Sequence, residues 1–550
     1  MSVVLKNSKL SNCYKSLSDV YLNKINPEIH KKAYIGAHEG LYAEIEFAGK
    51  YLDTCIRFYK ATKNEEFLKR AESVVRSIIR NQHEDGYLGG LVSENDWKDF
   101  SVWNQTFTVY GLVSYCKVTG DEKAADAAEK CINRIADHYM SEKDDICEGL
   151  NDGSQNLTIL VAATALYDIR ATDKIKNFII YIAKKIKKSD NNFFSFDSVL
   201  DLRSKKGIEN FVILLGIIAY GDITGDNSAY DACRKYWNEL NEKQIRETGN
   251  GSIHERWNAD GNKPMFIDYE RQPNENCVAV GWFELSRALF NRFKEARYVD
   301  AMEKNVYNHL LGSMNPECSD FGYYQPNYGI KYLDSNTHAM YMCCRYRGYS
   351  AISQIPYSIF DEDDKYITPI MYTDCEYTSD ISIKETTKYP YDGRICFDIN
   401  GNTEKKLRLR IPNWCKNFSV ERNGEVINEL PSDSYVCVDI SDGDKITLDL
   451  KPEFEINRVK INGKKYAYIT YGCVLLAIDS NLNECIYDID ISDTNIKQET
   501  FDNYLIGCSI DGYLNDKIIR VNFVDYASSA KVNVGDEFTI YVNEKKAFDV

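Results

Sequence analysis

The chain has 550 residues, 27% of them charged and 44% hydrophobic, which is ordinary for a globular protein of several domains. Its formal net charge of −16 argues against nucleic acid and anionic membrane surfaces as partners, because both are gripped by basic faces. No signal-peptide pattern or membrane-length apolar run is visible, and 17 scattered cysteines, an odd number, predict a reducing cytoplasm rather than a disulfide framework.

Residues up to about 355 have the periodicity of helices. Apolar residues recur at three- and four-residue spacing in EGLYAEIEFAGKYLDTCIRFYKAT and FLKRAESVVRSIIRNQ. A helix, a threonine-containing turn and a second helix recur weakly, with turn threonines 57, 53 and 52 residues apart: Thr62, Thr119, Thr172 and Thr224. Six such hairpins fit the available length and predict a closed ring, with an open helical solenoid as the alternative.

The pattern changes to strands after about Tyr357. Stretches such as KKLRLRIPNW, FSVERNGEVI and DKITLDL alternate apolar and polar residues, and Asn423-Gly424 is a hairpin-type turn. We therefore predict a helical domain over 1–357, a β-sandwich over 358–455 and a second all-β domain over 456–550.

A carboxylate and three thiols form the most specific constellation in the chain. Glu275 and Cys277 stand where a helix should begin, so both side chains can turn toward one point. Cys343 and Cys344 are the only adjacent cysteines, and adjacent cysteines rarely bridge each other. Three thiolates with one oxygen ligand suit four-coordinate zinc. The alternative is a set of unrelated buried thiols.

A second polar stretch lies upstream, in ETGNGSIHERWN. His254 and Glu255 follow a glycine-rich turn, where side chains can face a cavity. A glutamate beside aromatic and basic residues is a candidate general acid. The alternative is a solvated loop carboxylate.

The chain resembles glycoside hydrolase family 127, the β-L-arabinofuranosidase-like enzymes. The resemblance covers most of the chain and rests on an ordered set of stretches rather than on one motif. These are RNQHEDGYLGG, GSIHERW, ENCVAVGW, RYVDAMEKNVYNHLLGSM, MCCRYRGYSAISQIPYSIF, KYPYDGRICFDI, LRLRIPNWC, DGDKITLDL and KKYAYITYGCVLL.

The resemblance implies an (α/α)6 barrel followed by β-sandwich domains. It implies zinc held by Glu275, Cys277, Cys343 and Cys344, with Cys343 also the nucleophile and Glu255 the acid/base. The reaction would be a retaining double displacement with sulfur in place of the usual carboxylate.

Three positions depart from the family pattern. Phe107 stands where the family has a histidine, Asn156 replaces a second histidine, and Arg345 begins Arg-Tyr-Arg where Pro-x-Asn is usual. These positions belong to the sugar-contacting shell, so they bear on the substrate, or on whether activity is kept, more than on the reaction class.

Further residues are candidates for binding the sugar. Tyr323, in FGYYQPNYG, matches a family tyrosine near the pocket, with packing inside the barrel as the alternative. Trp103, Gln105 and His254 are looser candidates.

Two functional classes remain. The first is a cytoplasmic, exo-acting glycoside hydrolase that acts on furanosides in a short oligosaccharide or glycoconjugate. The second is a catalytically inactive, zinc-stabilised carbohydrate-binding protein. No nucleic-acid or membrane partner is expected, and a homodimer is left open. A different helical-barrel enzyme, such as a sugar epimerase, is disfavoured because the seven histidines form no cluster in the sequence.

Overall fold

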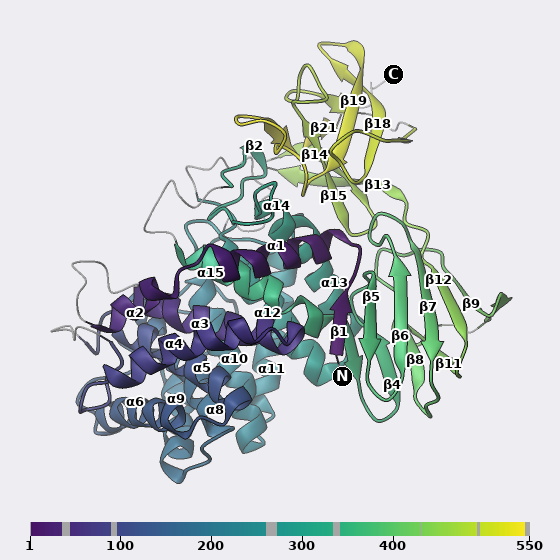
Figure 1. Ribbon diagram of the computed structural model, residues 1–550. Coiled ribbons are helices and arrows are strands. Elements are labelled where there is room, and N and C mark those ends of the chain that lie inside the picture. The colour runs from purple at the N-terminus through teal and green to yellow at the C-terminus, as the bar shows by residue number, and fades with distance from the viewer. Residues whose placement is uncertain are drawn as a thin grey trace.

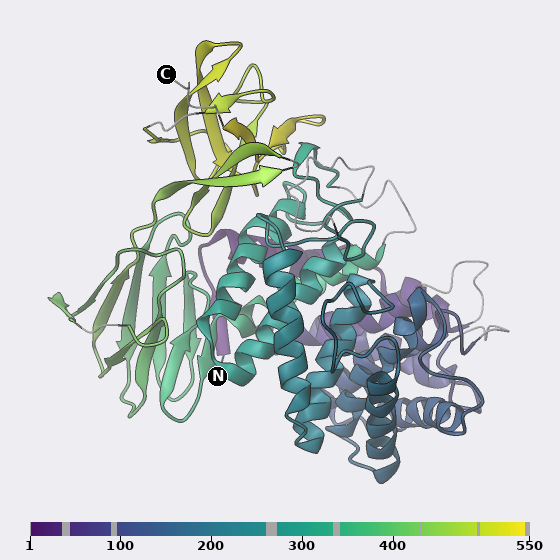
Figure 2. The same ribbon diagram turned by 180° about the vertical axis from the view of Figure 1, so that it is seen from behind.

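The structure, a computed structural model, has a helical domain followed by β-rich domains. The helices run from purple to teal in Figure 1 and the strands that follow run from green to yellow, while Figure 2 shows the molecule from behind. The predicted change from helices to strands is confirmed. The structure describes residues 2–35, 44–89, 96–259, 272–333, 342–428, 431–461, 463–491 and 495–544.

The helical domain contains fifteen α-helices among the described residues, with short turns of other helix types between them. The α-helices are α1 (Lys9–Asn23), α2 (Pro27–Ile35), α3 (Glu44–Thr62), α4 (Glu65–Arg80), α5 (Ser101–Thr119), α6 (Glu122–Met140), α7 (Ser154–Leu157), α8 (Ile159–Tyr167), α9 (Asp173–Lys188), α10 (Gly207–Thr224), α11 (Ser228–Lys243), α12 (Asn276–Phe293), α13 (Ala296–Lys304), α14 (Leu311–Ser313) and α15 (Met342–Ser353). The short turns are η1 (Asn151–Gly153), η3 (Asn305–Leu310) and η6 (Ile355–Ser358).

Six helices contact one another in cyclic order. They are α3, α5, α8, α10, α12 and α15, and α15 packs in turn against α3. The helix that follows each of the first five in the chain (α4, α6, α9, α11 and α13) packs on its outside, and α1 packs against α15. Side-chain chemistry separates the two sets: α10 is buried on almost every side, whereas α4 buries only one stripe, from Phe67 to Ile78.

The threonine turns that suggested a repeat close three of these helices. The hydroxyls of Thr62, Thr119 and Thr224 each donate to the carbonyl four residues back, and each accepts from the backbone N–H two residues on. Thr172 lies instead at the start of α9, where its hydroxyl caps the N–H of Ile175. The repeat therefore marks the turn between the two helices of each hairpin.

The described residues of the β-rich domains form three sheets. One has the order β1-β5-β6-β7-β12-β9-β10, the second β11-β8-β4-β3, and the third β13-β14-β21-β16-β18-β19-β15-β20-β2, with β17 paired to β18. The strands are β1 (Ser2–Leu5), β2 (Tyr328–Ile330), β3 (Phe360–Glu362), β4 (Tyr366–Pro369), β5 (Cys375–Thr378), β6 (Ser382–Thr387), β7 (Arg394–Asn400), β8 (Lys406–Arg410), β9 (Ser419–Arg422), β10 (Glu425–Val426), β11 (Tyr435–Asp439), β12 (Lys445–Asp449), β13 (Phe454–Ile461), β14 (Lys464–Tyr471), β15 (Val474–Asp479), β16 (Asp490–Ile491), β17 (Lys497–Glu499), β18 (Gly507–Leu514), β19 (Lys517–Asp525), β20 (Glu537–Thr539) and β21 (Val542–Glu544).

Two strands cross between domains, and neither was predicted. Strand β1, at the start of the chain, pairs antiparallel with β5, so that Leu5 lies opposite Cys375. Strand β2 lies in a loop of the helical domain and pairs with β20 of the third sheet, with Tyr328 opposite Thr539. Both β-rich domains are thus joined to the helices by backbone hydrogen bonds as well as by chain connections.

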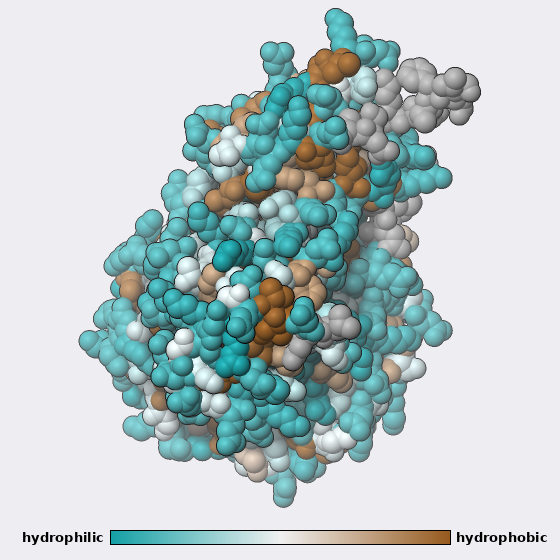
Figure 3. Space-filling model, turned by 90° about the vertical axis from the view of Figure 1, so that its right-hand side faces the viewer, coloured by the Kyte–Doolittle hydropathy of each residue, from teal (hydrophilic) through white to brown (hydrophobic). Residues whose placement is uncertain are grey.

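One helix among the described residues, α10, is long and apolar enough to cross a membrane by length and composition alone. Of its hydrophobic window, 72% is buried inside the protein, as in the core helix of a helical domain. The face of the molecule in Figure 3 is mostly hydrophilic, and its hydrophobic side chains lie in small separate groups.

Candidate active site

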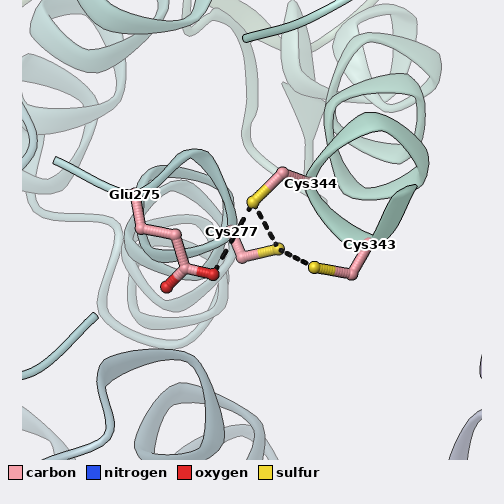
Figure 4. Close-up of side chains that lie close together, drawn as sticks. All are labelled: Glu275, Cys277, Cys343 and Cys344. Carbon is pink, nitrogen blue, oxygen red and sulfur yellow. Dashed lines mark hydrogen bonds between the residues drawn. The ribbon is translucent and has the colours of Figure 1, made fainter. Parts of the chain in front are cut away.

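The predicted carboxylate and three thiols meet at the contact between α12 and α15 (Figure 4). Glu275 is the N-cap of α12, Cys277 lies in its first turn, and Cys343 and Cys344 lie in the first turn of α15. The Cys277 sulfur is 3.9 Å from that of Cys343 and 3.2 Å from that of Cys344, which is 3.6 Å from Glu275 Oε1. Residues far apart in sequence thus form one cluster, half-buried at Cys343 and buried elsewhere.

Hydrogen bonds between side chains and the backbone hold this cluster in place. The Glu275 N–H donates to the Ser252 hydroxyl at 3.0 Å, and the Asn250 amide donates to the Glu275 carbonyl at 2.9 Å. The Asn276 side chain donates to the Cys344 carbonyl at 3.0 Å and so ties the start of α12 to α15. These bonds fix the two helix starts against each other.

The cluster fits a metal ion. Its four ligand atoms lie within 4.8 Å of one another, and no other such group is present in the part of the chain that the structure describes. A tetrahedral zinc ion separates its sulfur ligands by about 3.8 Å, close to the distances here. Glu275 Oε2 is also buried without a hydrogen-bond partner, which is costly unless something else binds it. The donor set of three sulfurs and one oxygen is one that zinc accepts.

Charge is distributed unevenly over the four side chains. Burial raises the pKa of Glu275 to about 7, and burial also raises the pKa of the Cys277 and Cys344 thiols. Hydrogen bonds from Cys277 and Cys344 hold the pKa of Cys343 well below its usual range. Cys343 is therefore the sulfur that most readily carries negative charge.

The Tyr323 hydroxyl lies between Glu255 and the cluster of cysteines, in contact with both. The Tyr323 hydroxyl donates to Glu255 Oε1 at 2.5 Å and accepts from the Cys343 thiol at 3.8 Å. Tyr324 donates to the same oxygen at 2.8 Å, and Lys206 forms an ion pair with Oε2. The predicted acid and the predicted nucleophile therefore lie on opposite sides of one hydroxyl group.

An unusual backbone conformation aims the Glu255 side chain. Both His254 and Glu255 have positive φ, 48° and 64°, in a tight turn that pairs Ile253 with Arg256. Such conformations are rare for residues other than glycine and persist where the surroundings enforce them. Here the Glu255 carbonyl accepts from the N–H of Gly207, which starts α10.

Trp103 and Phe107 form an apolar wall beside the cysteines. Both belong to a small buried cluster with Cys277 and Cys344, and their rings lie 4.8 Å apart at 72°. Tyr323 packs against the same cluster. Phe107 thus occupies space next to the sulfur atoms, at the position where the family pattern has a histidine.

Sequence reasoning missed a buried ion pair on this wall. Glu46 accepts from the Trp103 indole N–H and from Lys50 at 2.9 Å, and the Lys50 ammonium lies 4.5 Å from the centre of the Phe107 ring. Burial raises the pKa of Glu46, and the negative charge of Cys343 adds to the shift. The spacing of four residues was the available signal, but it is also that of an ordinary surface pair.

Two of the looser sequence candidates have partners away from the cysteines. The Gln105 amide accepts from the Leu88 N–H at 2.9 Å and donates to the Leu88 carbonyl at 2.7 Å. His254 is exposed, and its Nδ1 lies 3.2 Å from Gln272 Oε1. The structure therefore does not bring either side chain into the cluster, although His254 adjoins Glu255 in sequence.

The other two positions that depart from the family pattern also have their own partners. The Asn156 amide donates to the carbonyls of Trp97 and Glu148, both at 2.9 Å. Arg345 points to the other side of α15, where it forms an ion pair with Asp320. Of the three departures, only Phe107 lies against the cysteines.

Comparison with protein families defines the class of this fold and site. Residues 8–357 match the model described as β-L-arabinofuranosidase, GH127 catalytic domain, and residues 368–452 match the GH127 middle domain. The protein is thus a glycoside hydrolase by class. The chain belongs to family GH127, the β-L-arabinofuranosidase family, as its sequence resemblance had indicated, and a carbohydrate substrate follows from that membership.

Solved structures share the fold over its whole length. A GH127 β-L-arabinofuranosidase from Geobacillus stearothermophilus T6 has a TM-score of 0.78 at 16% identity, covering 99% of this chain and 100% of that one. A second GH127 β-arabinofuranosidase has a TM-score of 0.82 at 16% identity, covering 99% and 97%. No curated protein matches the chain.

Proposed function

We propose that the protein is a retaining, exo-acting glycoside hydrolase for furanosides of the β-L-arabinofuranoside type, with Cys343 as zinc-bound nucleophile and Glu255 as acid/base. The observation that carries the proposal is the Tyr323 hydroxyl, which contacts Cys343 and Glu255 at once. These contacts of 2.5 Å and 3.8 Å through one oxygen limit the distance from the sulfur to the carboxylate oxygen to about 6.3 Å, a limit that includes the carboxyl separation of retaining enzymes, about 5–5.5 Å.

The same proposal includes the architecture of an (α/α)6 barrel. Its support is the cyclic contact order of α3, α5, α8, α10, α12 and α15 together with an outer helix packed on each. Residues near the starts of α5, α8, α10, α12 and α15 belong to the cluster around the cysteines, and Glu46 near the start of α3 binds Trp103 of that cluster. The six helices would therefore run in one direction and present their N-terminal ends to the substrate. That direction suits the chemistry, because helix N-termini favour negative sulfur and carboxylate groups.

The first half of the reaction forms a bond from sulfur to the sugar. Glu275, Cys277, Cys343 and Cys344 would hold the zinc ion, which when bound keeps thiols deprotonated near neutral pH. The Cys343 sulfur donates an electron pair to the anomeric carbon as the glycosidic C–O bond breaks. Glu255, protonated for this step, gives its proton to the leaving oxygen.

The second half returns the enzyme to its starting state. Glu255, now a carboxylate, takes a proton from water as the water oxygen attacks the anomeric carbon and the C–S bond breaks. Lys206 and two tyrosine hydroxyls contact the Glu255 carboxyl group and would hold it in position for this step. Tyr323 contacts both reacting residues and would keep them aligned through both steps.

The cellular location belongs to the proposal as well. All 17 cysteines of the chain are free, none in a disulfide. Free thiols persist in a reducing compartment, which supports a cytoplasmic enzyme that acts on imported sugars.

Intact-mass analysis during turnover tests the proposal. Aryl β-L-arabinofuranoside is added to the Glu255→Gln variant, in which the intermediate should accumulate because water is no longer activated. We expect a pentosyl adduct on Cys343, located by peptide mapping, and none in a Glu255→Gln, Cys343→Ala double variant. An adduct on another residue, or steady release of inverted product without any adduct, would refute the cysteine mechanism.

A further inference from the structure

A cavity lies among the helices of the ring, at the end away from the cysteines. Its volume is about 490 Å³, and residues from the later turns of α3, α5, α12 and α15 line it, together with Tyr357. Phe107 and Val212 line this cavity and also belong to the apolar cluster that contains Cys277 and Cys344. These two side chains therefore lie between the cavity and the cysteines, and Lys50, which pairs with Glu46, lines the cavity as well.

Three arginines and two carboxylates face this cavity. Arg57 pairs with Asp53 at 2.7 Å, and Arg347 pairs with Glu284 at 2.6 Å. The third arginine, Arg287, leaves this set with one more arginine than carboxylates. An excess of positive charge inside a chain of net charge −16 calls for a physical explanation.

Arg287 has only neutral acceptors. Its guanidinium donates to Gln354 Oε1 at 3.2 Å and to the Tyr357 carbonyl at 3.3 Å, and among the described residues no carboxylate pairs with it. Burial, with repulsion from Arg57 as the next cause, lowers the pKa of Arg287 to about 10, so the group remains charged at neutral pH. Arg287 is half-buried, and although Glu284 lies near enough to act on it, no carboxylate forms an ion pair with it among the described residues. A bound anion would supply that partner.

Arg347 gives a second reason to expect an anion at this cavity. Arg347 is 6% exposed, lines the cavity, and has a buried Nε with no hydrogen-bond partner. Glu284 occupies its terminal nitrogens. At the same cavity, Arg287 thus lacks an ion-pair partner among the described residues and Arg347 Nε lacks a hydrogen-bond acceptor.

Helix ends do not account for these arginines. Cations do stabilise the carbonyl ends of helices, and Lys60 and Lys117 lie in last turns where they serve that role. Arg57, Arg287 and Arg347 lie five or six residues before the ends of their helices, which is more than one turn. The macrodipole effect fades within the last turn, so it does not reach them.

We propose that this cavity is a binding site for a small molecule that presents an oxyanion, a phosphate or a carboxylate, to Arg287 and its two neighbouring arginines. Guanidinium groups match both anions through paired N–H donors. The cavity has the size of a small-molecule site, and its charged and polar lining residues suit a compact polar ligand such as a sugar acid or sugar phosphate. This site involves neither Cys343 nor the metal. Its test is therefore independent of the proposed hydrolysis.

Isothermal titration calorimetry on the full chain tests the site. The probes are inorganic phosphate, glucuronate and, as the neutral comparison, glucose, all at one ionic strength. We expect saturable binding of phosphate or glucuronate, and which of them binds identifies the anion. Arg287→Gln should weaken that binding about tenfold or more, because a charge-assisted hydrogen bond is lost.

Matched variants separate the site from general salt effects. Arg292 lies on the same helix but packs on the Tyr230 ring outside the cavity, so Arg292→Gln should bind like the unmodified chain. Asn291 is exposed and lines the cavity, so Asn291→Asp should fold and compete with the anion while Asn291→Gln should not. Absence of binding by both anions, or equal affinity in Arg287→Gln and Arg292→Gln, overturns the proposal. If Arg287→Gln fails to fold, the Asn291 variants decide: equal anion affinity in Asn291→Asp and Asn291→Gln also overturns the proposal.

Discussion

The two ends of the helical ring differ in charge although the same helices form both. At one end Cys277 and Cys343 lie second in α12 and α15, where helix N-termini favour negative groups. At the other end Arg57, Arg287 and Arg347 face a cavity with fewer carboxylates than guanidiniums. The proposed thiolate chemistry and the proposed anion site thus lie at different ends of the same set of helices.

Replacing Cys343 by alanine should have the largest effect on activity. The result would assign the chemistry to the end of the helical ring that carries the cysteines. Loss of a nucleophile typically lowers kcat by about four orders of magnitude or more. Initial rates on an aryl β-L-arabinofuranoside measure it. The control is Cys396→Ser, a half-buried cysteine on β7, which should keep full activity. Turnover of the alanine variant within tenfold of the unmodified enzyme contradicts the assignment.

Replacing Glu255 by glutamine should lower kcat/KM by about 10²–10⁴ when the leaving group is a sugar alcohol, because that oxygen must be protonated. The loss should be smaller with a nitrophenol leaving group, which departs without a proton. Glu148→Gln, at a carboxylate paired with Arg203 on the surface, is the control. Equal losses for both leaving groups would argue that Glu255 only supports the structure.

Metal analysis compares the two ends directly. Zinc should bind with a stoichiometry of about one per chain, and Cys344→Ser should reduce it well below one, because structural zinc affinity depends on each thiolate. Arg287→Gln should leave the zinc content unchanged. A zinc content that falls equally in both variants would show that the two ends are not independent.

Glu209 gives the smallest expected effect, a dependence of stability on pH at the N-terminal end of the ring. Burial raises its pKa to about 7 in the folded protein, above the value near 4.5 of an unburied glutamate. Its stabilising contribution is therefore complete below about pH 4.5 and declines as the pH rises toward 7. Glu209→Gln should gain about 2–3 kcal/mol relative to the unmodified chain between pH 5 and pH 8, measured by chemical denaturation. A constant difference across that range contradicts the ionisation.

Local patterns account for the parts of the fold that the sequence predicted. The periodicity of helices and the alternation of strands are written within ten or twenty residues, as in α4 and β7. The pairings of β1 with β5 and of β2 with β20 join segments hundreds of residues apart. Short strands of three or four residues carry too little pattern to name a partner at that distance.

The candidate site likewise has residues that the sequence could indicate and residues that it could not. Glu275, Cys277 and the cysteine pair stand at helix starts with rare residue types, so the sequence could indicate them. Gln105 shows why neighbours in sequence mislead: Trp103 and Phe107 are four residues apart and share a helix face, whereas Gln105 is turned about 200° away from Trp103, toward Leu88. The Glu46 and Lys50 pair resembles a surface pair until the fold buries it.

The pairing of β1 with β5 also has a consequence for synthesis on the ribosome. Its partners are about 370 residues apart, so at rates of roughly 5–20 residues per second, β1 waits roughly 20 to 70 seconds for β5 to emerge. During that time Val3 and Leu5, buried in the finished sheet, have no permanent cover. The helical domain is translated first, yet its leading segment is secured only when the sheet behind it has formed.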